Sequence, residues 1–239
     1  MAVQNKLAGL KGNEDRLVEY TTSNNEKIKL TPRMAREFLV SGGGEVTDQE
    51  IIMFLNLCKY QRLNPFLREA YLIKYGNAPA TLVVGKEVFT KRARRNKDYA
   101  GQQAGIVVLK QDGSMESRIG MLKLPEEELV GGWAKVFIEN FKEPVEITVP
   151  LDEYIGRKKD GDINSQWRGK PATMIRKVAL VQALREAFPE DFTGMYSQEE
   201  VDTGDLLLDE TPIDESQIVN AQSEPEALPE EIPSDPFAG

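Results

Sequence analysis

The acidic C-terminal segment limits what this chain can fold into more than any other feature of the sequence. Thirteen of the 39 acidic residues and none of the 30 basic ones lie between Ser197 and Gly239, with five prolines and no aromatic residue before Phe237. Such a segment buries too little apolar surface to offset the entropy of ordering it. We therefore expect residues 197–239 to form a disordered acidic tail.

The rest of the chain carries the opposite charge. The whole chain has a formal net charge of −9, but residues 1–196 contain 26 acids against 30 bases, a net charge of +4. A basic body suits an anionic partner such as a nucleic acid. The tail then has three interpretations: a solubilising appendage, a polyanion that competes with nucleic acid for a basic groove, or a peptide that docks a partner through its apolar islands at residues 206–208 and 236–237.

The chain contains one cysteine, Cys58, and no histidine. These counts exclude an intramolecular disulfide, a cysteine-based zinc site, a Ser-His-Asp triad and a histidine acid or base. A lone cysteine indicates a reducing compartment. No apolar run approaches the roughly 18 to 20 residues that span a bilayer, and residues 1–12 lack the apolar core of a signal peptide. We expect a soluble, cytoplasmic protein.

Capping residues and apolar periodicity predict an α+β body, a small antiparallel sheet flanked by helices, in residues 31–196. Thr31 and Pro32 can begin a short helix, and Thr47 to Glu50 form a capping box for a second helix in which Cys58 is a core residue. The expected helices cover residues 31–41, 48–62, 86–96 and 171–188. The expected strands cover residues 68–75 and 80–84, which form a hairpin, and 105–109, 117–122, 133–139 and 145–149, which form a meander.

Two further segments are polar and weakly periodic. We expect residues 1–30 to be an exposed N-terminal arm, which is a candidate contact between subunits, and residues 156–170 to be a basic loop.

Motifs for nucleotide, metal or nuclease chemistry fail in detail. Leu82 to Lys86 is similar to the end of a phosphate-binding loop, but Ala80 and Glu87 stand where that loop needs a glycine and a Ser or Thr. Gly42 to Gly44 lacks the third glycine of a dinucleotide loop. No lysine has an acid two residues before it, as a two-acid nuclease motif requires, and Asp160 to Asp162 supplies too few ligands for calcium. We expect no cofactor, no metal and no catalytic activity.

Fourteen of the 30 bases lie in two short stretches. Residues 86–97 hold six bases against one acid, and residues 157–185 hold eight against two. Charge runs are usually solvated faces, but Lys177 and Arg185 fall within or beside the apolar stripe of their predicted helix. A partly buried base needs an anionic partner, and a phosphate backbone supplies one. Trp167 suits either a sugar or base contact or a place in the core.

Three stretches carry a resemblance to a known family. They are Leu63-Asn64-Pro65-Phe66 with Glu69-Ala70-Tyr71, Val83-Val84-Gly85 before the basic helix, and Trp167 with Pro171, Met174-Ile175-Arg176-Lys177 and Ala179. In order and spacing they resemble the Bet branch of the phage-encoded RecT/Bet (Red beta) single-strand annealing proteins, over roughly residues 45–196. The resemblance implies ATP-independent binding of single-stranded DNA, annealing of complementary strands, and assembly into rings or helical filaments.

The resemblance also implies partners in a bacterial cytoplasm. The family works beside a phage exonuclease, and some members carry a folded C-terminal domain that engages the exonuclease and the host single-strand binding protein. This chain has the acidic tail instead. Its ending at residues 232–237 is similar to the acidic tip of bacterial single-strand binding proteins.

We therefore predict a protein of phage homologous recombination that holds single-stranded DNA by its phosphates and pairs complementary strands. Base stacking supplies about 1.4 kcal/mol per base-pair step, so pairing needs no ATP site. A passive single-strand binding protein and a nuclease subunit are the alternatives. The expected DNA-binding residues are Lys86, Lys91, Arg92, Arg94 and Arg95 on one wall, and Arg157, Lys158, Lys159, Trp167, Arg168, Arg176, Lys177 and Arg185 on the other.

Overall fold

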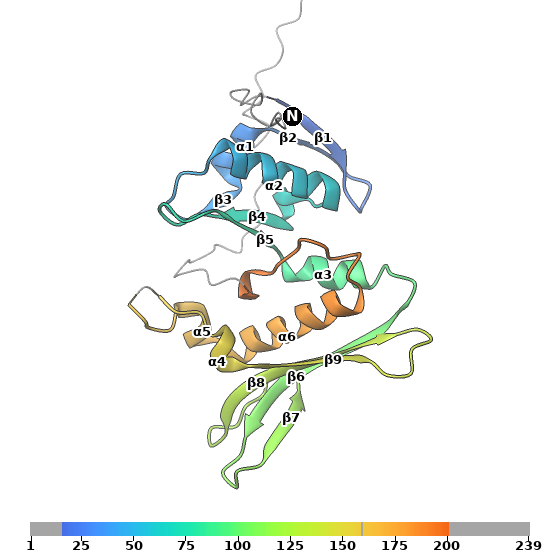
Figure 1. Cartoon of the computed structure of the whole chain (residues 1–239), viewed down its shortest axis with the longest axis vertical. Coiled ribbons are helices and arrows are strands. Elements are labelled where there is room, and N and C mark those ends of the chain that lie inside the picture. Colours follow the sequence, from blue (N-terminus) through green and yellow to red (C-terminus); the bar gives the residue numbers. More distant parts are fainter. Residues whose placement is uncertain (1–15, 159, 201–239) are drawn as a thin grey trace, which may run out of the picture.

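We describe residues 16–158 and 160–200 from a computed structural model of the whole chain (Figure 1). The predictions for residues 1–15, for Lys159 and for residues 201–239 of the expected tail lie outside this range. Within it the chain forms the predicted α+β body. Helices α1 and α2 and two small sheets make one half, and a four-stranded sheet with the long helix α6 makes the other (Figure 1).

The first two helices begin where the sequence predicts. Helix α1 (Pro32–Phe38) is capped by the Thr31 side chain, which accepts a hydrogen bond from an amide of its first turn. Helix α2 (Asp48–Gln61) begins with both hydrogen bonds of the capping box formed by Thr47 and Glu50. Cys58 is fully buried, which confirms its place in the core.

Residues 18–30, which we expected to be exposed, form a hairpin instead. Strands β1 (Val18–Thr21) and β2 (Lys27–Leu30) pair antiparallel, and β1 contacts α2. Ile28 and Leu30 are buried and alternate with exposed lysines. Two apolar residues in a strand of four residues give too weak an alternation to stand out within a polar segment.

The second small sheet contains the predicted hairpin. Strands β4 (Ala70–Ile73) and β5 (Thr81–Val84) pair antiparallel, and β3 (Val40–Ser41) joins β4 in parallel. A 3-10 turn, η2 (Pro65–Leu67), leads into β4 and is capped by the Asn64 side chain. Helix α3 (Lys86–Ala93) follows β5 directly and confirms the predicted basic helix.

The largest sheet is not the meander that we predicted. Strands β6 (Tyr99–Leu109), β7 (Met115–Ile119), β8 (Glu128–Ile138) and β9 (Val145–Pro150) lie in the order β7-β6-β8-β9. Strand β8 pairs along β6 rather than with β7. The two long strands carry the buried residues, whereas β7 is short and half exposed and forms an edge.

Helix α6 (Pro171–Ala187) packs across this sheet and confirms the last predicted helix. The apolar stripe from Met174 to Phe188 is buried. Gly132 on β8 permits the close approach, because a Cβ atom there would lie 2.6 Å from the Ile175 carbonyl oxygen. The sheet therefore fixes α6 and, with it, the basic residues along the edge of the helix.

Part of the expected loop at residues 156–170 is helical. After α4 (Leu151–Tyr154), the chain forms the short helix α5 (Ser165–Gly169), which is capped by the Asn164 side chain. Trp167 on α5 is 3% exposed and packs in the main core. Five residues are too few to show a helical period in the sequence.

After α6 the chain turns back between the two halves of the body (Figure 1). Met195 and Ser197 are fully buried, and the 3-10 turn η3 (Gln198–Glu200) contacts α6. The Val84 amide on β5 donates a hydrogen bond of 2.9 Å to the Tyr196 carbonyl oxygen. The first four residues of the expected tail therefore lie against the body.

Glu50 makes stability depend on pH. Its carboxylate accepts hydrogen bonds from Lys74 Nζ at 2.7 Å and from the amides of Thr47 and Ala80 at 2.8 and 2.6 Å. Burial alone would raise the pKa of this carboxyl, but these hydrogen bonds lower the pKa from 4.5 to about 2. A carboxyl with a lowered folded-state pKa stabilises the fold above its unfolded pKa, and this contribution is lost as the pH falls through the folded pKa.

We predict that Glu50→Gln lowers the free energy of unfolding by about 3 kcal/mol near neutral pH, because the substitution leaves the buried Lys74 ammonium without its carboxylate. Between about pH 4.5 and pH 2 the variant should lose less stability than the wild type. Urea denaturation over this pH range measures both effects, with Glu45→Gln, at an exposed acid nearby, as the control. Equal pH dependence in wild type and Glu50→Gln would contradict the assignment.

Candidate nucleic-acid interface

One cleft is lined by some of the bases from each of the two basic stretches of the sequence. Helix α3 follows β5 and lies beside α6, although some eighty residues separate the two helices in the chain (Figure 1). The cleft between them has a volume of about 460 Å³. Lys86 and Lys91 line it from α3, Lys177 from α6, and Arg68 from the turn before β4.

On the α3 wall, Lys86 and Lys91 are paired with acids but remain accessible. The Lys86 ammonium lies 3.1 Å from the carboxylate of the exposed Glu87. The Lys91 ammonium lies 3.2 Å from Glu69, and the Lys91 side chain is 52% exposed. The Lys86 side chain is 24% exposed and the Glu69 side chain 12%, so both pairs are only partly exposed to solvent.

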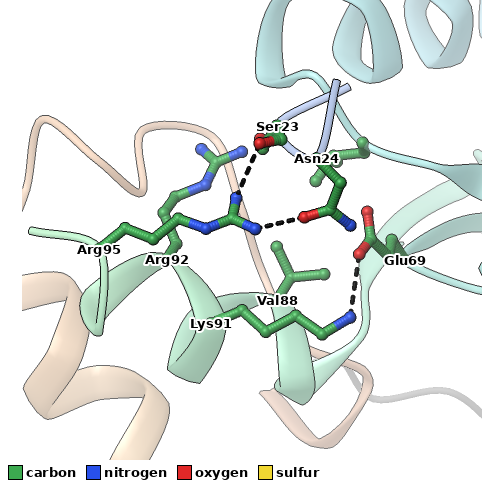
Figure 2. A pocket seen from close by; sticks show the side chains of 8 residues that line it. Ser23, Asn24, Glu69, Val88, Lys91, Arg92 and Arg95 are labelled. Atoms are coloured by element: carbon green, nitrogen blue, oxygen red, sulfur yellow. Dashed lines mark hydrogen bonds and ion pairs between the residues drawn. The ribbon is translucent and has the colours of Figure 1, made fainter. Parts of the chain in front are cut away.

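Arg92 and Arg95 join α3 to the rest of the body. Arg92 is half-buried, and its guanidinium donates hydrogen bonds to Gln61 and to the Asp191 carbonyl oxygen. Burial lowers the pKa of Arg92. Arg95 donates to the Ser23 carbonyl oxygen at 3.3 Å and to the Asn24 side chain in the β1-β2 turn (Figure 2). These contacts tie three separate segments to α3.

Arg94 is exposed. Among the residues of the first stretch, the structure therefore brings Lys86 and Lys91 to the cleft and uses Arg92 and Arg95 as bridges.

The basic residues before α6 lie in and beside a small loop. Arg157 donates to the Gly161 carbonyl oxygen at 3.0 Å, and the Lys158 amide donates to the Asp162 carbonyl oxygen at 2.7 Å. Arg168 on α5 pairs with the Asp162 carboxylate at 3.3 Å. None of these residues lines the cleft. The indole of Trp167 is buried and is not offered at the surface of the free protein.

The three bases on α6 are half-buried, and each has a partner within the chain. Arg176 donates to the Ala104 carbonyl oxygen on β6 at 3.1 Å. Lys177 lies 2.8 Å from the Glu199 carboxylate, and Arg185 pairs with the carboxylate of Glu200. The anionic partner that we expected for the bases beside the apolar stripe is thus supplied by the residues that follow α6.

Arg68 is not among the DNA-binding residues that the sequence predicted. It stands alone between η2 and β4, so no cluster drew attention to it. Its backbone is left-handed, with φ of 56°, and its Nε is buried without a hydrogen-bond partner in the described part of the chain. Arg68 lines the same cleft as Lys86, Lys91 and Lys177, and it adds a fourth cation there.

Among the described residues that line the cleft, four are basic and three are acidic, the acids being Glu69, Glu87 and Glu199. In residues 16–158 and 160–200 no group of three acids or cysteines lies close enough to hold a metal ion. Among the described residues that line the cleft, Tyr71 is the one aromatic residue, and its hydroxyl donates a hydrogen bond of 2.8 Å to Gln198.

In residues 16–158 and 160–200 no helix is long and apolar enough to cross a membrane.

Comparison with known proteins agrees with the resemblance seen in the sequence. The chain is 32% identical over 161 residues to an uncharacterized protein of Ureaplasma parvum serovar 3, and this match covers 66% of the chain and 62% of that relative. The family model described as the RecT family matches residues 26–216, which include both walls of the cleft. The chain belongs to the RecT family.

Proposed function

We propose that this chain is an ATP-independent single-strand DNA annealing protein of phage homologous recombination, which holds the strand by its backbone in the cleft between α3 and α6. Membership of the RecT family supports the role in recombination and annealing. The observation that carries the proposal is the position of Lys86 and Lys91, Lys177, and Arg68, which three separate parts of the chain bring to one cleft.

The chemistry of annealing fits this cleft. An annealing protein must bind phosphates without reading bases and must leave the Watson-Crick edges open to a second strand. Lysine and arginine side chains bind phosphates, whereas extensive stacking on aromatic rings would compete with pairing. Of the described residues that line the cleft, Tyr71 is the single aromatic one, and Trp167 lies in the core.

The other proposed binding residues lie outside the lining of the cleft, and we propose that they contact a longer strand. Arg94, Arg157 and Arg168 are exposed and can approach the backbone of a longer strand, and Arg176 lies beside Lys177 on α6. We further propose homo-oligomers in which the cleft continues from subunit to subunit, with the N-terminal residues as a contact, in a bacterial cytoplasm. A phage exonuclease and the host single-strand binding protein are the proposed partners.

We predict that Lys91→Ala and Lys177→Ala each weaken binding to single-stranded oligonucleotides of every sequence alike. Each substitution should also reduce the salt dependence of binding by about one phosphate contact. Fluorescence anisotropy over a series of salt concentrations measures both quantities. Lys142→Ala, at an exposed lysine in the β8-β9 turn, is the matched control. Wild-type affinity and salt slope in both cleft variants would overturn the proposed site.

Adding complementary oligonucleotides separates annealing from the alternatives. We predict that the protein accelerates duplex formation without ATP, since pairing itself supplies the free energy. A passive coat would slow duplex formation. A nuclease subunit would shorten a labelled strand when magnesium is present. Either of these two outcomes would refute annealing while leaving DNA binding in place.

Unlike the other candidate DNA-binding residues, Arg92 should contribute strongly to the stability of the fold. We predict that Arg92→Ala lowers the free energy of unfolding by about 3 kcal/mol, because it removes a half-buried charge that bonds to Gln61 and Asp191. Arg94→Ala, at the exposed position two residues later, should change stability by less than about 0.5 kcal/mol. Urea denaturation of the two variants provides the comparison. Equal stability of the two would show that the Arg92 contacts do not hold α3 in place.

A further inference from the structure

Lys177 and Arg185 form a pair of cation positions along the edge of α6. They lie eight residues apart, which is about 12 Å along the helix axis. The side chains are 27% and 25% exposed, because the edge of α6 faces the chain that returns over it. Both are neutralised by adjacent residues of η3, Glu199 and Glu200, whose side chains are 9% and 5% exposed.

The chain after α6 is held by buried apolar side chains as far as Met195 and by polar contacts beyond it. Phe192 and Met195 are fully buried and anchor the chain that leaves α6. Beyond them, the polar contacts of residues 196–200 hold the segment against the body. They include the hydrogen bond from the Val84 amide to the Tyr196 carbonyl oxygen at 2.9 Å and the one from Tyr71 to Gln198 at 2.8 Å.

The same segment borders the cleft. Gln198 and Glu199 line it together with Lys177. Arg185 lies 4.9 Å from the ring centre of Tyr196, and its guanidinium also donates to the Met195 carbonyl oxygen at 3.0 Å. The Glu199 carboxylate therefore lies next to Lys177 at the cleft, and the Glu200 carboxylate pairs with Arg185 about two turns further along α6, beyond the residues that line the cleft.

We propose that Glu199 and Glu200 hold the places of two backbone phosphates in the free protein, and that a bound single strand displaces them from Lys177 and Arg185. This rests on the proposed function. The exchange gives each cation another anion and lets the displaced carboxylates enter water, against the loss of the hydrogen bonds that hold residues 196–200, whereas an unpaired half-buried cation would be costly. A strand must compete with these acids, so its apparent affinity is its intrinsic affinity multiplied by the fraction of protein in which Glu199 and Glu200 have left the two cations.

The first test uses the full chain and removes the acids without changing their shape. Glu199→Gln and Glu200→Gln, singly and together, are compared with Glu190→Gln, at an exposed acid in the turn after α6. A fluorescent oligonucleotide of mixed sequence serves as the probe at low salt. Each single substitution should tighten binding about threefold and the double substitution about tenfold, with Glu190→Gln unchanged.

Lys177→Ala supplies the coupling control. If Glu199 acts by covering Lys177, Glu199→Gln should tighten binding in the wild type and have no effect in the Lys177→Ala background. Salt-dependent binding by the wild type, with equal or weaker binding by both Gln variants, would overturn the displacement and leave the proposed function standing. No binding by any of these proteins would instead overturn the proposed function.

A second measurement uses the unaltered protein, so it does not depend on whether a variant folds. The Glu200 amide donates to the Ser197 carbonyl oxygen at 3.2 Å within η3. We expect hydrogen exchange of this amide to become faster when the oligonucleotide saturates the protein, while the amides in the middle of α6 stay protected. Unchanged or slower exchange of residues 198–200 would show that the segment is a permanent brace, and the proposal would fail.

Discussion

The pairing of the α6 cations with the carboxylates that follow them in the chain determines how this surface behaves. Lys177 and Arg185 are half-buried, and a half-buried cation without an anion is costly. In this structure Glu199 and Glu200 of the same chain supply the two anions. In the proposed function a backbone phosphate meets the same requirement, since it can pair with the same cations.

The position of these cations follows from how closely α6 packs on the sheet. Gly132 lets the helix backbone approach β8, and the apolar stripe of α6 is buried against β6, β8 and β9. The basic residues are left at the edge of that contact, beside the opening toward α3. Arg92 fixes the opposite wall, because its guanidinium joins α3 to the end of α2 and to the turn after α6. Both walls of the cleft are therefore held by the core.

Local signals predicted most of the longer helices and strands but missed the β1-β2 hairpin and α5, and long-range contacts decided how the strands pair. Some signals depend only on residues close together in the chain. They are the caps at Thr31 and Thr47, which begin α1 and α2, and the apolar period of α6, and all three helices form as expected. The pairing of β8 with β6 depends on which strands bury their faces, which spacing does not reveal. The basic stretches were visible in the sequence, but their partners were not. Glu69 and Glu199 reach Lys91 and Lys177 through the fold alone.

The carboxylates of Glu199 and Glu200 also affect how a bound strand is released in the proposed mechanism. Annealing requires that a strand be held long enough to meet its complement and then passed into a duplex, and a grip on phosphates that is too tight would oppose the second step. Carboxylates that can return to Lys177 and Arg185 lower the cost of release, because the cations are never left unpaired. In the proposed mechanism the acids that reduce affinity for a single strand are thus the ones that keep binding reversible, and base pairing rather than ATP gives the exchange its direction.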